Sequence, residues 1–120
     1  MVTAFVVRDD EVLLLRRSAR VGTYRGRWAG VSGHLEADTA AEQAWVELSE
    51  ELGLGRDALA LVAAGEPLEI RDDALGRTWR VYPFRFSLAA GAEPRLDWEH
   101  VEMRWAAPAE MRDMDTVPGL

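Results

Sequence analysis

Residues 33–54 read GHLEADTAAEQAWVELSEELGL, and this stretch decides the fold because it holds the one long helical pattern of the chain. At Thr39 the composition changes to Ala, Glu, Gln, Leu and Trp, and the pattern ends at Leu52. Asp38 or Thr39 suits the N-cap position, and Gly53 suits the position past the C-terminus. We therefore predict a helix over residues 39–52.

One face of this predicted helix is apolar. At about 100° per residue, its apolar side chains fall within about a third of the circumference, which is typical of a face that packs on a core. The residues of this stripe are Ala41, Ala44, Trp45, Leu48 and Leu52.

A second face carries three carboxylates, Glu47, Glu50 and Glu51. Spacings of three and four bring them together, where they repel one another by a few tenths of a kcal/mol per exposed pair. They also lie near the helix C-terminus, where the helix dipole disfavours negative charge. A cation among them would remove both penalties. On spacing alone, an ordinary solvated acidic face is an equally good interpretation.

The ligand types indicate which cation this would be. No His or Asp joins the cluster at zinc-like spacing, and oxygen ligands alone favour Mg²⁺, with Mn²⁺ as a possible substitute. Magnesium typically bridges a few carboxylates to substrate phosphates. The pattern therefore points to hydrolysis of a phosphate ester or phosphoanhydride.

The flanking sequence predicts strands. Two apolar runs, residues 2–8 and 12–17, read as a hairpin, and residues 28–31 as a short strand that ends in a turn at Ser32-Gly33. Further strands are predicted over residues 59–70, 78–88 and 101–106, with Pro83 indicating an edge or a bulge. Strands around one or two helices favour a mixed α/β (α+β) fold, in a single domain over residues 1–120.

Composition excludes several classes. The chain has 120 residues, no cysteine and a net charge of −7, so disulfides and Cys-ligated zinc are excluded. Such acidity makes a poor binder of a nucleic acid polymer. We see no secretory signal and no apolar run near the roughly 20 residues that cross a bilayer, so we expect a cytoplasmic protein without a membrane partner.

The run from Gly33 resembles the signature of the Nudix hydrolases. The opening Gly33 and Glu36 match, as do the helix glutamates and the residues that follow them. Outside the signature, Trp28 resembles an aromatic of the family, and the segment from Glu99-His100 to Trp105 resembles its late acidic loop and last strand. The matching helix positions are Glu47, Leu48, Glu50, Glu51, Gly53 and Leu54.

The resemblance implies an α/β/α sandwich with a mixed, curved sheet. It implies a Nudix-type pyrophosphohydrolase that cleaves a phosphoanhydride in a nucleoside triphosphate, or in a nucleoside diphosphate linked to another group. Glu47, Glu50, Glu51 and the Ser32 carbonyl match metal ligands of the family, so Glu47 and Glu51 would also serve catalysis. The late-loop Glu99 would be the base or bind a further metal, and Glu102 is its rival.

Three departures support an alternative. The loop after Gly33 is one residue shorter than the pattern, Ser32 replaces a glycine, and Val46 replaces the arginine that clamps the carboxylates in the family. Valine cannot make a forked contact to a carboxylate. The alternative is a catalytically weak or inactive nucleotide-binding, regulatory module. Val46 and the apolar C-terminal end are also places to look for a homodimer interface.

The remaining candidates concern the substrate. Arg16, Arg25 and Arg27 lie in the most basic stretch and suit phosphate oxygens of a small nucleotide-like substrate, with ordinary surface charge as the other interpretation. His34 and His100 are expected to be plain surface residues. The chain continues past Leu120 in the natural protein, or this end packs on another surface.

Overall fold

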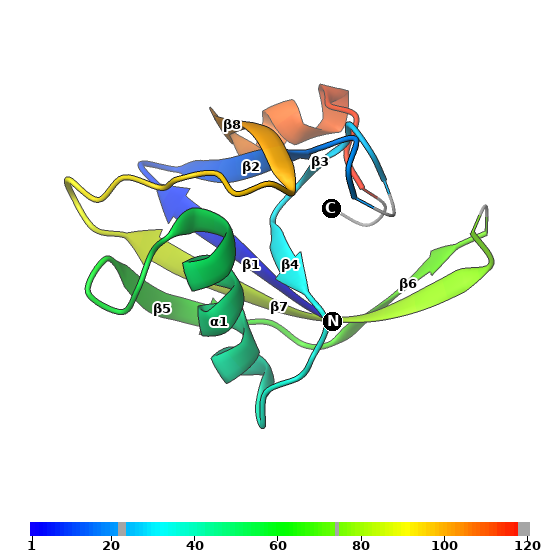
Figure 1. The fold of residues 1–120 in the computed structure, drawn as a ribbon, viewed down its shortest axis with the longest axis horizontal. Coiled ribbons are helices and arrows are strands. Elements are labelled where there is room, and N and C mark those ends of the chain that lie inside the picture. Colours follow the sequence, from blue (N-terminus) through cyan, green and yellow to red (C-terminus); the bar gives the residue numbers. More distant parts are fainter. Residues whose placement is uncertain (22–23, 74, 118–120) are drawn as a thin grey trace.

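The computed structural model describes residues 1–21, 24–73 and 75–117. They form a mixed sheet with one α-helix, which confirms the predicted fold class (Figure 1). The elements are β1 (Val2–Arg8), β2 (Glu11–Arg17), β3 (Trp28–Ala29), β4 (Val31–Gly33), α1 (Ala40–Leu52), β5 (Leu59–Ala64), β6 (Leu68–Asp72), β7 (Arg77–Leu88), β8 (His100–Ala106) and a 3₁₀ helix, η1 (Pro108–Asp113).

Strand β1 organises the sheet. It pairs in parallel with β7, and antiparallel with β4 near its start and with β2 near its end. Strand β8 extends the sheet beyond β2. Because β1 has two different antiparallel partners, β2 and β4 diverge, and the sheet opens beside β4, where the glutamates of α1 approach it.

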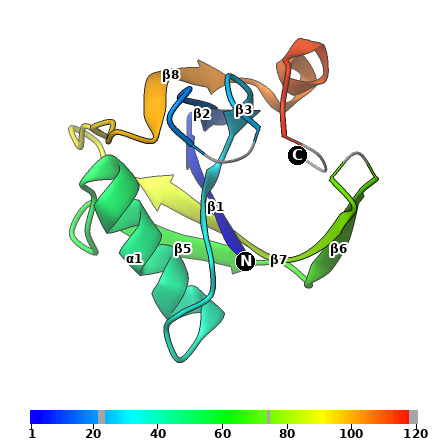
Figure 2. The ribbon, with the colours of Figure 1, turned by 45° about the vertical axis from the view of Figure 1, so that its right-hand side comes forward.

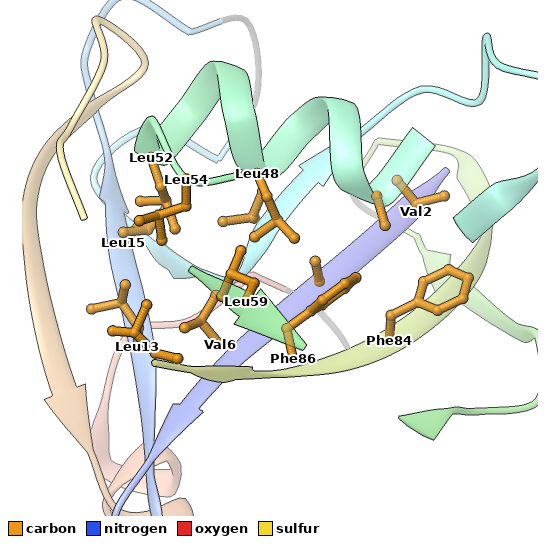
Figure 3. Packing of buried hydrophobic residues seen from close by; sticks show 14 residues of the cluster. Val2, Val6, Leu13, Leu15, Leu48, Leu52, Leu54, Leu59, Phe84 and Phe86 are labelled. Carbon is orange, nitrogen blue, oxygen red and sulfur yellow. The ribbon is translucent and has the colours of Figure 1, made fainter. Parts of the chain in front are cut away.

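Helix α1 packs on one face of this sheet (Figure 3). Leu48 and Leu52 are fully buried against side chains of β1 and β7, and Trp45 meets Phe86 edge-on at 4.9 Å between ring centroids. The Thr39 hydroxyl accepts the N–H of Glu42 at 3.1 Å, and Gly53 ends the helix with a φ of +67°. The predicted helix, its caps and its apolar face are confirmed.

Two strand predictions are wrong. Residues 59–70 form two strands rather than one, because β5 and β6 pair with different halves of β7. Pro83 lies where one partner ends and the other begins, and Gly65 donates its N–H to the Pro83 carbonyl there. Proline has no backbone N–H, and at this changeover Pro83 therefore removes no hydrogen bond from the sheet. Ser32 and Gly33 are strand residues of β4 rather than a turn, since both pair with β1.

The β6–β7 hairpin extends away from α1 (Figures 1 and 2). At the other end of the chain, Trp28 of β3 exchanges backbone hydrogen bonds with Asp115 and Val117. Residues 118–120 lie outside the described residues. Among the described residues, no helix is long and apolar enough to cross a membrane.

Replacing Leu48 by Ala should lower the free energy of unfolding by about 2–5 kcal/mol, because it leaves a cavity between α1 and the sheet. Val46→Ala is the control, since Val46 is 42% exposed and its truncation should cost about 0.5 kcal/mol or less. Urea denaturation measures both. Equal losses in the two variants would contradict the packing of α1 described above.

Candidate active site

Glu47 is held by its own helix and by the loop that precedes it. Its Oε1 accepts a hydrogen bond of 2.9 Å from Nε2 of Gln43, one turn earlier. The Oε1 of Gln43 accepts the backbone N–H groups of Glu36 and Ala37 at 3.0 and 2.8 Å. Gln43 is 3% exposed. This buried amide therefore fixes the Glu47 carboxylate relative to the loop.

Gly33 faces the same carboxylate from β4. A Cβ atom at this position would overlap the carboxylate of Glu47, so no larger residue fits without displacing it. The glycine at the opening of the signature thus has a steric reason here. It lets a charged side chain of α1 lie directly against the sheet.

Glu51 lies deeper and is 3% exposed. Burial, a hydrogen bond to Glu47 and the negative charges of Glu47, Glu99 and Asp97 together raise the pKa of Glu51 to about 10, with burial the largest cause. A carboxylate in such surroundings binds either a proton or a cation.

Glu99, the residue before β8, and His100, its first residue, also reach this point. The pKa of Glu99 is raised, first by burial and then by Asp97, while Arg17 opposes the shift. Burial lowers the pKa of His100. Its Nε2 lies 3.7 Å from Oε1 of Glu51, and its Nδ1 lies 3.2 Å from Oδ1 of Asp97.

The structure brings most of the predicted acidic residues together. The negative charges of Glu47 and Glu50 both raise the pKa of Glu99, although Glu50 is exposed. The rival Glu102 is exposed and forms a 3.0 Å ion pair with Arg16. The expectation of a surface position for His100 is wrong, because the residue is 5% exposed and packs beside Glu51.

These residues fit a divalent cation. Within the described part of the chain, the only buried side-chain polar atoms without a hydrogen-bond partner are Oε2 of Glu51 and Nε2 of His100. One ligand atom from each of Glu51, Glu99 and His100 lies within 4.8 Å of the others. Unpartnered buried polar atoms are costly, and a shared cation would satisfy them.

An apolar cavity of about 110 Å³ lies on the face of the sheet opposite α1. Thr3 and Phe5 of β1 line it, whereas the alternate residues of β1 point toward α1. Ser32 lines it as well, and the neighbouring Gly33 lies against the Glu47 carboxylate. The other lining residues are Met1, Arg17, Tyr24, Ala29, Gly30, Leu68, Ile70, Trp79, Val81, Pro83 and Val117.

Hydrogen bonds fix the aromatic wall of this cavity. The indole Nε1 of Trp79 donates to the Tyr24 hydroxyl at 3.1 Å, and that hydroxyl donates to Oδ2 of Asp72 at 2.6 Å. Burial and the Asp72 carboxylate raise the pKa of Tyr24. The wall thus joins the β6–β7 hairpin to the loop before β3.

The predicted substrate arginines do not line the cavity. Arg16 is paired with Glu102, and Arg27 lies 3.7 Å from Asp115. Arg25 donates from Nε to the Val21 carbonyl at 2.8 Å. Arg17, which belongs to the same basic stretch, lines the cavity itself.

The sequence analysis did not predict a role in the site for Gln43 or Asp97. The i, i+4 spacing of Gln43 to Glu47 is a signal that could have shown the first contact. No local signal could have shown the Asp97–His100–Glu51 chain, because Glu51 and His100 are 49 residues apart and meet only in the folded structure.

In metal-free protein, the stability should fall as pH rises from 7 to 9. In this range folded Glu51 keeps a proton because its pKa is about 10, whereas unfolded Glu51, near pKa 4.5, has lost it. The folded state binds the extra proton, so stability falls by up to about 1.4 kcal/mol per pH unit. Thermal unfolding in a chelator at several pH values measures this slope.

Glu51→Gln is the control, since it cannot titrate and retains the contribution of every other group. We expect a flatter slope in that variant, and in the wild-type protein once Mg²⁺ or Mn²⁺ is added. The same slope in wild type and variant would contradict the assignment of the shift to Glu51.

Comparisons with known proteins agree with this geometry. A family model described as NUDIX domain matches residues 1–119. A protein of Mycobacterium tuberculosis named "Putative 8-oxo-dGTP diphosphatase 2" is 35% identical over 120 residues, which cover 98% of this chain and 79% of that protein.

Solved structures resemble the whole fold. The MutT protein from Methanosarcina mazei Go1 has a TM-score of 0.75 and 25% identity, covering 98% of this chain and 82% of that one. A Nudix hydrolase from M. smegmatis, RenU, has a TM-score of 0.75 at 20% identity, covering 98% of this chain and 74% of that one. The chain therefore belongs to the Nudix family, and its enzyme class is that of the Nudix-type pyrophosphohydrolases.

Proposed function

We propose that this protein is a Mg²⁺-dependent hydrolase, with Mn²⁺ as a possible substitute, that cleaves a phosphoanhydride bond. The substrate is a nucleoside triphosphate or a nucleoside diphosphate linked to another group. One observation carries the proposal: the carboxylates of Glu47, Glu51 and Glu99 converge around unpartnered buried atoms, and Ser32, next to Gly33, lines an aromatic-walled cavity. The diphosphatase name of the M. tuberculosis relative supports it.

Glu47, Glu50, Glu51 and the Ser32 carbonyl are the proposed holders of the cation. When bound, a divalent cation neutralises charge that develops on the phosphoryl oxygens and polarises the bond that breaks. Gln43 and Gly33 keep Glu47 in place for this task. The burial of Glu51 excludes water from one side of the site.

Glu99 is the proposed general base. Its raised pKa makes the ionised side chain a stronger proton acceptor than an ordinary glutamate. Glu99 takes a proton from the attacking water, whose oxygen bonds to phosphorus. The phosphoanhydride P–O bond breaks, and the leaving phosphate keeps the electron pair. Glu102 is less suited, because it is paired with Arg16.

The cavity is the proposed nucleoside site. Trp79 and Phe5 offer flat or apolar surfaces to a base, and Arg17 offers a cation toward the phosphates. Arg16, Arg25 and Arg27 are proposed to contact phosphate oxygens after Arg16 and Arg27 leave their present carboxylate partners. A net charge of −7 favours a free nucleotide over a nucleic acid polymer.

Three further expectations stay predictions. These are a single domain over residues 1–120, a cytoplasmic location and a homodimer. Val46 remains a place to test for a dimer interface, because it is exposed on α1.

Glu51→Gln should lower kcat by at least about 100-fold, because it removes a charged ligand from the proposed cation site. Glu42→Gln is the matched control: this exposed glutamate lies in the first turn of the same helix, and its substitution should leave kcat unchanged. The kcat of each variant is measured by incubating it with Mg²⁺ and a panel of nucleotides and monitoring the release of phosphate.

Full turnover by Glu51→Gln would contradict the assigned site. Nucleotide-dependent thermal stabilisation without turnover in the wild-type protein would contradict the hydrolase proposal. It would favour the binding module that Val46 first suggested.

A further inference from the structure

His100 presents a buried nitrogen atom to the carboxylate cluster. Its side chain is 1% exposed, that of Glu51 is 3% exposed, and Nε2 lies 3.7 Å from Oε1 of Glu51. Nε2 makes no hydrogen bond in the described structure, and neither does Oε2 of Glu51. The imidazole is thus enclosed and directed at the acidic cluster, yet it leaves one of its two nitrogens unpaired.

Asp97 determines what that nitrogen offers. Oδ1 of Asp97 lies 3.2 Å from Nδ1 of His100 and also accepts the N–H of Glu99 at 3.1 Å. An ionised carboxylate only accepts hydrogen bonds, so Nδ1 carries the proton. In a neutral ring, Nε2 is then a lone pair that faces Glu51. A carboxylate that orients an imidazole in this way is the usual arrangement behind a histidine that binds a metal.

The separations suit one shared ion. Two ligands that each lie about 2.1 Å from an ion are about 3.0 Å apart at a right angle and about 4.2 Å apart when opposite. The 3.7 Å between His100 and Glu51 lies within these limits. The ligand atoms of all three residues lie within 4.8 Å. Because 4.8 Å exceeds the upper limit of about 4.2 Å, a single ion shared by all three residues requires Glu99 to approach the other two.

We propose that Nε2 of His100 binds the divalent cation together with Glu51 and Glu99, so that the site prefers a first-row transition ion such as Mn²⁺ over Mg²⁺. An imidazole nitrogen suits transition ions, whereas Mg²⁺ prefers oxygen ligands. The inference rests on the proposed function only in placing a cation at Glu51, and it gives Glu99 the role of a ligand to that cation in place of the role of base. The ligand set is then mixed nitrogen and oxygen, rather than the all-oxygen set that the helix spacing indicated.

The test detects nitrogen next to the metal without using activity. The chain has two histidines, so His34→Gln leaves His100 as the only imidazole of the untagged protein. Mn²⁺ is bound to this variant, prepared once with natural and once with ¹⁵N-labelled histidine, and electron spin-echo modulation is recorded. We expect ¹⁴N modulation in the first sample and its replacement by a ¹⁵N pattern in the second.

Affinity provides the second measurement. His100→Gln should weaken Mn²⁺ binding by about tenfold or more and Mg²⁺ binding by less than about threefold. His34 is exposed, and His34→Gln should change neither affinity. Calorimetric titration of the two ions into each variant measures this, and the labelling experiment gives an answer even where His100→Gln does not fold.

Two outcomes would overturn the inference, and they are distinguishable. Stoichiometric Mn²⁺ binding that Glu51→Gln abolishes, without any histidine nitrogen modulation, would leave the proposed hydrolase site in place and remove His100 from it. No binding of Mn²⁺ or Mg²⁺ to the wild-type protein would overturn both this inference and the proposed function.

Discussion

Negative charge concentrated beside a buried end of α1 is the constraint on which the other features of this site depend. Glu51 is buried among other acidic groups, and removing a carboxylate from water is costly unless something compensates it. The helix cannot move away, because Leu48 and Leu52 anchor it in the core. Compensation must therefore come to the carboxylates, and ligand atoms of Glu51, Glu99 and His100 lie close enough together for a cation to provide it.

The orientation of the carboxylates does not depend on the helix position where the family has an arginine. Val46 is 42% exposed and contributes no polar contact. Gln43 instead holds Glu47 from one turn earlier, and its amide is itself fixed by two backbone N–H groups. On the far side, Asp97 holds His100 against Glu51. Two separate supports thus take the place of one forked contact.

The sequence was informative wherever the physics is local. The helix, its Thr39 cap and its acidic face follow from spacings within one turn or two, and the structure has them as predicted. Gly65 and Pro67 are also local signals, but we read residues 59–70 as one strand because their apolar character continues across the break. The contact of Gly33 with Glu47 and the burial of His100 depend on chain segments that meet only in the fold, so composition and period could not show them.

Strand β7 belongs to two parts of the molecule at once. Its later half carries Phe86 in the core under α1, and its earlier half carries Trp79 in the cavity wall, with Pro83 between them. Trp79 and Phe86 pack in different places, so a substitution at Trp79 acts on the cavity wall and a substitution at Phe86 acts on the core under α1. The cavity wall can therefore change its shape through the outer half of β7 while the inner half keeps α1 packed on the sheet.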